Sequence, residues 1–214
     1  DKQYDKVISI SRSAQEYNPE EMVFYYFEGF AQYMKKENEA ALQTFKKGEA
    51  QIKPDSDPNI VSDFYAIMGD ILHEKGLEKQ AFEAYDSCLH WRPDNLSALN
   101  NYAYYLSLTK SDLKKAELMS YKTIKKEPTN STFLDTYAWI LFLQGRYEEA
   151  NTYIEQAIKN DSTPSGTLFE HAGDIYYQAG KPEAALEAWQ KALQLGNNSA
   201  TLRKKINLKK YIPE

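Results

Sequence analysis

The chain has 214 residues, of which 42% are hydrophobic, and it carries a formal net charge of −5. A chain of this length can bury a sizeable core, and no apolar run approaches the roughly 18 residues that a membrane-spanning helix requires. The acidic balance argues against generic nucleic-acid binding, which needs a basic surface, and the single cysteine, Cys88, excludes a disulfide framework.

Helical segments are predicted to follow one another along the whole chain. The first is a single helix over residues 3–18, which Pro19 ends. Five helix–turn–helix units are then predicted: 22–54, 62–93, 97–128, 131–162 and 166–196. The last segment is a capping helix over residues 199–211, for which Ser199 is the expected N-cap. Glycine and proline are sparse and fall mainly at the turns, which favours an all-α fold with residues 1–214 in one elongated domain.

Small or β-branched residues recur in these segments with a period of about 34 residues. One column, with gaps of 34, 40, 35, 34 and 35 residues, lies in the second helices: Val7, Ala41, Ala81, Ala116, Ala150 and Ala185. Another column lies in the first helices: Gly29, Gly69, Ala103, Ala138 and Gly173. Two antiparallel helices pack closely only where small side chains let their backbones approach, so the columns predict the seam inside each helical pair.

The second whole unit carries the most complete version of this pattern. It runs from Tyr65 to Pro93 through Gly69, Leu72, Gly76, Ala81, Tyr85 and Cys88. The pattern resembles the tetratricopeptide repeat (TPR), and the resemblance covers almost the whole chain. It implies an all-α fold, a right-handed TPR superhelix (an α-α solenoid) of one half repeat and five whole repeats, ended by the capping helix.

Three departures from the repeat pattern are informative. In the first whole unit, Glu28 and Gln32 occupy positions where apolar side chains are expected. The 40-residue gap places extra residues in a loop, 53–60, that is rich in Pro, Asp, Asn and Ser. Because the chain starts halfway through a repeat, with Asp1 rather than Met, we expect it to be a fragment that lacks earlier repeats and any signal peptide.

The resemblance also implies a binding groove on the inner face of the superhelix, lined by the first helix of each repeat. The family's groove positions fall here on Tyr26, Phe30, Tyr33, Asp70, His73, Asn100, Tyr104, Asp135, Trp139, Phe142, Glu170, Asp174 and Tyr177. Aromatic residues are good anchors because they bury much area with few rotatable bonds. Tyr104 and Trp139 could equally pack against the next repeat, and the aspartates of this set are expected to be solvated.

The chemistry of this groove predicts the class of partner. Family members that bind the C-terminal carboxylate of a peptide hold it with Lys, Arg and Asn side chains, but here Asn100 and Asn101 have no cation beside them. An acidic, aromatic groove favours a cationic or apolar polypeptide segment. We therefore expect a protein-binding scaffold that forms part of a larger assembly. Self-association into a homo-oligomer and a purely architectural spacer are the alternatives.

Catalytic, cofactor-binding and metal-binding motifs are not found. The histidines, His73, His90 and His171, lack the spacing of a zinc or catalytic motif. Cys88 has no evident base, and no glycine-rich phosphate loop occurs. We predict that the chain is not an enzyme and needs no cofactor or metal.

Basic residues concentrate in two segments despite the acidic average. One set is expected to face outward from a second helix: Lys114, Lys115, Lys122, Lys125 and Lys126. The other set crowds the terminal helix: Arg203, Lys204, Lys205, Lys209 and Lys210. A solenoid needs a polar terminal cap, so the terminal set is expected to be solvated. A surface for acidic partners or anionic lipid is the alternative.

Two runs, residues 99–106 and 134–141, resemble bacterial TPR proteins of the cell envelope, many of which are exported lipoproteins. The lysine- and tyrosine-rich composition is compatible with a Bacteroidetes-like source. The resemblance implies export to the bacterial periplasm or outer membrane, with a cytoplasmic location as the alternative.

Overall fold

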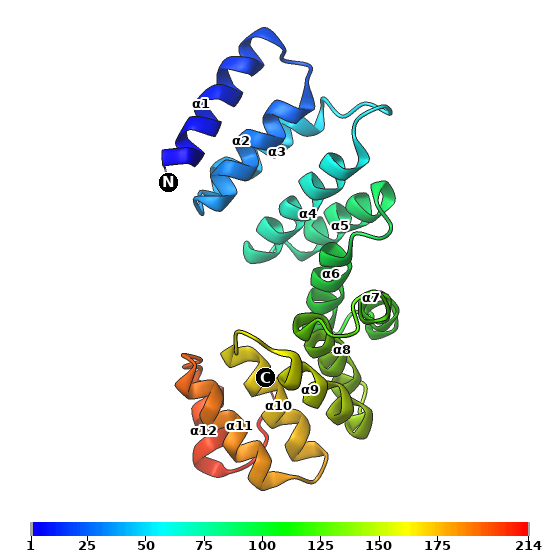
Figure 1. Ribbon diagram of the computed structural model, residues 1–214, viewed down its shortest axis with the longest axis vertical. Coiled ribbons are helices and arrows are strands. Elements are labelled where there is room, and N and C mark those ends of the chain that lie inside the picture. Colours follow the sequence, from blue (N-terminus) through cyan, green and yellow to red (C-terminus); the bar gives the residue numbers. More distant parts are fainter. Residues whose placement is uncertain (1, 214) are drawn as a thin grey trace. The chain divides into compact units, whose positions relative to one another are not determined.

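The computed structural model describes residues 2–213, and α-helices form the secondary structure of this range (Figure 1). No strand occurs among these residues, which confirms the predicted all-α fold. Contacts group the chain into two compact units, and the division falls between Ala98 and Leu99. We call residues up to Ala98 unit 1 and residues from Leu99 unit 2. The repeat boundaries inferred from the sequence stay predictions.

Unit 1 begins with α1 (Lys2–Tyr17) and continues with two helical hairpins. The hairpin helices are α2 (Met22–Met34), α3 (Asn38–Glu49), α4 (Pro58–Glu74) and α5 (Glu78–Trp91). Helix α1 packs on α2, α2 on α3, and α4 on α5. Phe45 and Phe64, both fully buried, meet edge to face with ring centroids 4.9 Å apart and link the two hairpins.

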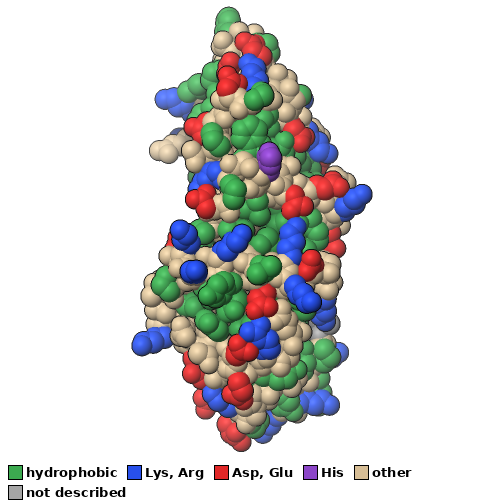
Figure 2. All heavy atoms as spheres, turned by 90° about the vertical axis from the view of Figure 1, so that its right-hand side faces the viewer, with side chains coloured by type: hydrophobic (Ala, Val, Ile, Leu, Met, Phe, Trp, Pro, Cys, Tyr) green, Lys and Arg blue, Asp and Glu red, His purple; other side chains and the backbone are tan. Residues whose placement is uncertain are grey.

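Unit 2 contains most of α6 (Leu96–Thr109) and the helices that follow it. These are α7 (Leu113–Lys126), α8 (Ser131–Leu143), α9 (Tyr147–Asn160), α10 (Gly166–Gln178), α11 (Pro182–Gln194) and α12 (Ala200–Leu208). Helices α8 and α9 form one hairpin, α10 and α11 form another, and α12 packs on α11 (Figure 1). On the face shown in Figure 2, basic side chains gather over α7, where Lys114, Lys122 and Lys125 are exposed.

Glycine in the first-helix column permits large aromatic side chains to cross the seam. A Cβ atom on Gly173 would lie 2.3 Å from Cδ1 of Trp189, and one on Gly69 would lie 2.9 Å from the Tyr85 ring. Trp189 and Tyr85 are fully buried, as are Ala81 and Ala150 of the other column. The small residues therefore lie where the hairpin helices approach, because a larger side chain would overlap the packed rings.

The ends of α4 and α12 are set by local interactions, which place two of them away from the ends of the predicted segments and confirm one predicted cap. Helix α4 begins at Pro58 rather than residue 62, because the Asp57 side chain accepts a hydrogen bond from the Asn59 backbone N–H at 2.8 Å and caps this end. Ser199 is confirmed as an N-cap, since its Oγ accepts from the Leu202 N–H at 3.0 Å. Helix α12 ends at Leu208, not residue 211, because Lys209 adopts the left-handed conformation.

Candidate protein-binding site

In unit 1, aromatic side chains of α2 lie beside carboxylates of α4. Tyr26 and Phe30 stack with ring centroids 6.0 Å apart. Burial and the nearby Asp63 raise the pKa of Tyr26 above its usual value. Burial, Asp70 and Glu74 raise the pKa of Tyr33 in the same way. Aromatic side chains of α2 and carboxylates of α4 therefore lie close together in unit 1.

The two other groove candidates of unit 1 lie on α4. The Tyr85 hydroxyl donates a hydrogen bond to the Asp70 carboxylate, so Asp70 also holds a core side chain of α5 in place. His73 is half-buried one turn further along α4. Asp70 is thus tied to the packing of the hairpin, and the more exposed Phe30 offers the larger accessible surface, at 36% of its maximum.

In unit 2, five rings from four segments form a continuous line, which we call the aromatic row: Tyr104, His171, Trp139, Phe142 and Tyr211. The Trp139 ring stacks on His171 at 4.1 Å and on Phe142 at 4.9 Å between centroids. The Tyr104 ring on α6 lies 6.1 Å from the His171 ring between centroids. Trp139 therefore packs against the next hairpin.

Tyr211 closes one end of the aromatic row. It belongs to the segment that follows α12, and its ring meets Phe142 edge to face with centroids 5.6 Å apart. Phe142 is consequently only 5% exposed, although it was expected to line an open groove. Tyr211 was not found from the sequence because it belongs to no repeat column and contacts a residue far away in the chain.

His171 is paired with a predicted groove residue. Its Nδ1 lies 2.9 Å from Oδ1 of Asp135, and the His171 side chain is 8% exposed. Burial opposes protonation of the imidazole, but Asp135, Asp174 and Glu170 outweigh burial, so the pKa of His171 is held above its ordinary value. The sequence offered no motif for this pair, because its members are 36 residues apart.

Asp174 was expected to be a solvated groove charge, but both Asp174 and its neighbour Glu170 are buried. The ammonium of Lys205 on α12 lies 2.9 Å from Glu170 and 2.7 Å from Asp174, and Lys205 itself is 1% exposed. Trp189 Nε1 donates to the same Asp174 at 2.9 Å. Lys205 therefore departs from the prediction of a solvated terminal cap, since its two partners compensate its buried charge.

This triad of Lys205, Glu170 and Asp174 has one more carboxylate than cation. Burial raises the pKa of Asp174 to about 6 despite the nearby Lys205, and Glu170 adds to the shift. Burial alone would lower the pKa of Lys205, but the two carboxylates raise it. Both shifts favour protonation, as expected where buried negative charge is in excess. The remaining candidate, Tyr177, is half-buried with its ring 5.9 Å from that of Trp189.

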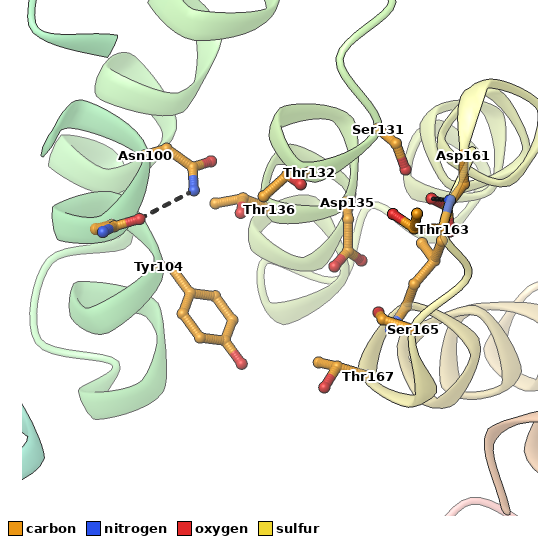
Figure 3. A pocket seen from close by; sticks show the side chains of 12 residues that line it. Asn100, Tyr104, Ser131, Thr132, Asp135, Thr136, Asp161, Thr163, Ser165 and Thr167 are labelled. Carbon is orange, nitrogen blue, oxygen red and sulfur yellow. Dashed lines mark hydrogen bonds between the residues drawn. The ribbon is translucent and has the colours of Figure 1, made fainter. Parts of the chain in front are cut away.

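A polar cavity of about 460 Å³ lies beside the aromatic row, between α6, α8 and α10. Asn100 and Tyr104 form its α6 wall, and the Asp135 carboxylate points into it from α8 (Figure 3). Several hydroxyl side chains complete the lining: Ser131, Thr132, Thr136, Thr163, Ser165 and Thr167. The structure thus brings together three of the predicted site residues, Asn100, Tyr104 and Asp135.

The apparent irregularity of the first whole unit has a structural cause. Glu28 is 5% exposed and accepts hydrogen bonds from Arg12 Nε at 2.7 Å and from Gln15 Nε2 at 2.8 Å, both on α1. Gln32 Nε2 donates to the same carboxylate at 3.1 Å. The polar pair on α2 therefore attaches α1 to the first hairpin.

Two further properties bear on the chemistry of the described residues. Burial raises the pKa of the Cys88 thiol to about 11, so the thiol is protonated at neutral pH and is a poor nucleophile. In the range 2–213, no group of three or more His, Cys, Asp or Glu side chains is placed to hold a metal ion. Over the same range, no helix has both the length and the apolar character needed to cross a membrane.

Comparison with known proteins agrees with the fold and the seam. Tetratricopeptide repeat models match residues 62–95 and 138–200. Human tetratricopeptide repeat protein 13 is 30% identical over 134 residues, which are 60% of this chain and 15% of that protein. The type IV pilus assembly protein PilF of Pseudomonas aeruginosa is 26% identical over 152 residues, which are 71% of this chain and 60% of PilF.

Among solved structures, the TPR protein YrrB, which has an unusual peptide-binding site, is similar to this chain with a TM-score of 0.69 at 19% identity. The match covers 92% of this chain and 97% of YrrB. These findings show that the chain contains tetratricopeptide repeats, and proteins with these repeats are typically non-enzymatic scaffolds for protein–protein interaction. It spans 15% and 60% of the lengths of the two curated relatives.

Proposed function

We propose that this chain binds a polypeptide segment through aromatic and acidic surfaces on the first helices of its hairpins. In unit 1 the surface is formed by Tyr26, Phe30 and Tyr33, next to the carboxylates of α4. The observation that carries the proposal is in unit 2, where Tyr104 and Asp135 line a polar cavity beside the aromatic row. The peptide-binding site of YrrB, a protein of similar fold, supports the same class of function.

The charges on these surfaces favour a cationic or apolar segment as the ligand. Asp63, Asp70 and Asp135 contribute carboxylates, and no Lys or Arg lines the unit 2 cavity. A peptide carboxylate would meet like charge there, which is unfavourable in a partly dehydrated site. Glu170 and Asp174 are not included in the proposed surface, because Lys205 covers and neutralises them.

Selection from a random peptide display library tests the proposal without a known partner. The selected peptides are expected to be rich in Lys, Arg and aromatic residues, and calorimetry is expected to show weaker binding to Tyr104→Ala and Tyr26→Ala. Loss of one aromatic anchor should weaken binding by about 2 kcal/mol, or roughly thirtyfold. Tyr17, 83% exposed at the end of α1, provides the control Tyr17→Ala, which should bind as the parent does.

The proposal fails if no peptide is enriched, or if the enriched peptides bind the groove variants and the parent equally. Circular dichroism of each variant shows whether its fold is retained.

Self-association is the alternative that the exposed apolar residues of unit 1 favour. Ile10 and Tyr17 on α1 are 58% and 83% exposed, which leaves an apolar strip on this helix. Multi-angle light scattering separates the two functions: a dimer that Ile10→Asp and Tyr17→Asp dissociate, together with the absence of any peptide ligand, would favour self-association.

A location in the bacterial cell envelope is part of the proposal, within a larger assembly. It is supported by the alignment of 71% of this chain with a type IV pilus assembly protein. Fractionation of cells that produce the full-length protein, followed by detection with an antibody against this chain, tests the location. Recovery with the cytosolic fraction alone would contradict it.

A further inference from the structure

We propose that the polar cavity of unit 2, between α6, α8 and α10, is a subsite for the guanidinium group of an arginine side chain. The inference rests on the proposed function, which it makes specific by naming the residue type that the bound segment must present. It follows from three observations: an unpaired buried acceptor on α6, a carboxylate on α8, and an aromatic ring on α6 that lines the same cavity.

The unpaired acceptor is the side-chain oxygen of Asn100. This residue is 5% exposed, and its Nδ2 donates toward Oδ1 of Asn101 at 3.5 Å. Its Oδ1 is buried and has no hydrogen-bond partner, and the side chain points across the cavity toward α8 (Figure 3). A buried acceptor without a donor is unfavourable, so a ligand that brings an N–H group to this position gains an interaction that is otherwise missing.

The second acceptor is Asp135, which faces the same space from α8. Its side chain is 17% exposed, and the carboxylate points into the cavity between Tyr104 and Thr167 (Figure 3). One oxygen is held by His171 at 2.9 Å, which fixes the orientation of the group. Asp161 contributes another carboxylate to the lining, and its Oδ1 already accepts from the Thr163 N–H at 3.0 Å. The lining contains no Lys, Arg or His.

Helix dipoles act against a cation here, but they are weaker than the carboxylates. Ser131 and Thr132 begin α8, and Ser165 caps α10, so two helix N-termini border the cavity. Each N-terminus carries a partial positive charge of about half a unit, and side-chain caps already satisfy one amide of each helix. Asp135, which is paired with His171, and Asp161 bring two carboxylates to a lining that has no Lys or Arg, so the cavity favours a cation over an anion.

The positions of the two acceptors, on different helices, favour a guanidinium over an ammonium. Asn100 and Asp135 lie on different helices, and a planar guanidinium with five N–H donors can bridge separated acceptors while an ammonium acts as a compact point charge. Tyr104 lines the same cavity from α6, and an aromatic ring is a group against which a guanidinium stacks (Figure 3). A cavity of about 460 Å³ has room for the whole side chain.

Titration of the isotope-labelled full chain with a capped Gly-Arg-Gly peptide, followed by amide NMR, tests the inference. We expect saturable shifts of the Asn100 side-chain amide signals. A matched peptide with citrulline, which has nearly the same shape without the charge, should bind at least about tenfold more weakly, because charge-assisted hydrogen bonds are lost. The capped Gly-Lys-Gly peptide should also bind more weakly than the arginine peptide.

Variants at the cavity wall and rim identify the site. Asp135→Asn should weaken arginine binding by about tenfold through loss of the charge-assisted contact. Thr132→Lys places a cation at an exposed rim position and should abolish binding, whereas the size control Thr132→Gln should not. Glu187→Gln removes an exposed carboxylate of α11 that lies outside the cavity lining, and it should leave the arginine affinity unchanged.

Several outcomes would overturn the inference: citrulline or lysine peptides that bind as tightly as the arginine peptide, binding that Thr132→Lys retains, or orthophosphate that shifts the same signals in place of the peptides. Peptides from the display selection that require Tyr104 but not arginine would refute this subsite while the proposed function stands. The absence of any selected peptide would refute the proposed function itself.

Discussion

Removal of the buried ammonium of Lys205 is the sharpest test of how unit 2 is held together. Methionine has a similar length and no charge, so Lys205→Met leaves Glu170 and Asp174 buried without their common partner. Because Lys205 is 1% exposed and both carboxylates are at most 10% exposed, the value for a buried ion pair applies rather than that for a surface pair. The expected loss of stability is about 3–5 kcal/mol at neutral pH.

The loss should depend on pH in a defined direction. The pKa of Asp174 is raised to about 6 even with Lys205 present, so the protonated acid is favoured in the folded state relative to the unfolded state. An acid with a raised folded pKa makes the folded state less stable as pH rises. The stability falls between the pKa of the unfolded chain, about 3.9 for Asp, and the pKa of the folded state. Without Lys205 the pKa of Asp174 rises further, so the variant should lose less at pH 5 than at pH 8.

Urea unfolding followed by far-UV circular dichroism at both pH values measures this loss, and hydrogen exchange locates it in α10 and α12. Lys204→Met is the matched control, because Lys204 is exposed on the same helix and should change stability by less than about 0.5 kcal/mol. Equal effects of the two substitutions, or an effect of Lys205→Met that is the same at pH 5 and pH 8, would refute the reasoning.

Three further predictions concern the seam, a turn and the buried histidine. Gly173→Ala brings a Cβ atom to 2.3 Å from Trp189 and should lower stability by about 1–3 kcal/mol, measured by chemical denaturation. Lys110→Gly should raise stability by about 1 kcal/mol in the same assay, because Lys110 has a φ of 53° that a side chain disfavours. Protonated His171 stabilises the folded state, and this contribution is complete below the pKa of about 6.5 that histidine has in the unfolded chain. The contribution should be lost as pH rises through the raised pKa of the folded state. A thermal-melting series in which His171→Phe retains the same pH dependence as the parent would contradict the role of the Asp135 pair.

Much of the fold was predictable because it depends on local patterns that recur. The seam at Ala81, Ala150 and Gly173 follows from spacing along a helix, and the N-cap at Ser199 follows from the chemistry of one residue. The aromatic and acidic character of the candidate surface also follows from position, as Tyr26 near Asp63 illustrates.

The candidate site was less predictable because residues far apart in the chain determine which groups are accessible. Asp174 and Phe142 occupy groove positions by their spacing, yet Lys205 covers the former and Tyr211 the latter. Neither partner belongs to the repeat pattern. The unpaired oxygen of Asn100 also depends on what α8 brings near it, which no spacing rule describes.

The sequence by itself determined the all-α fold and its tetratricopeptide repeats, because helix periodicity, small-residue columns and turn residues act within one or two turns of chain. Only the tertiary structure decided which charges are buried and which rings are covered. A charged side chain such as Lys205 is buried only when partners compensate its desolvation, and those partners lie 31 and 35 residues away.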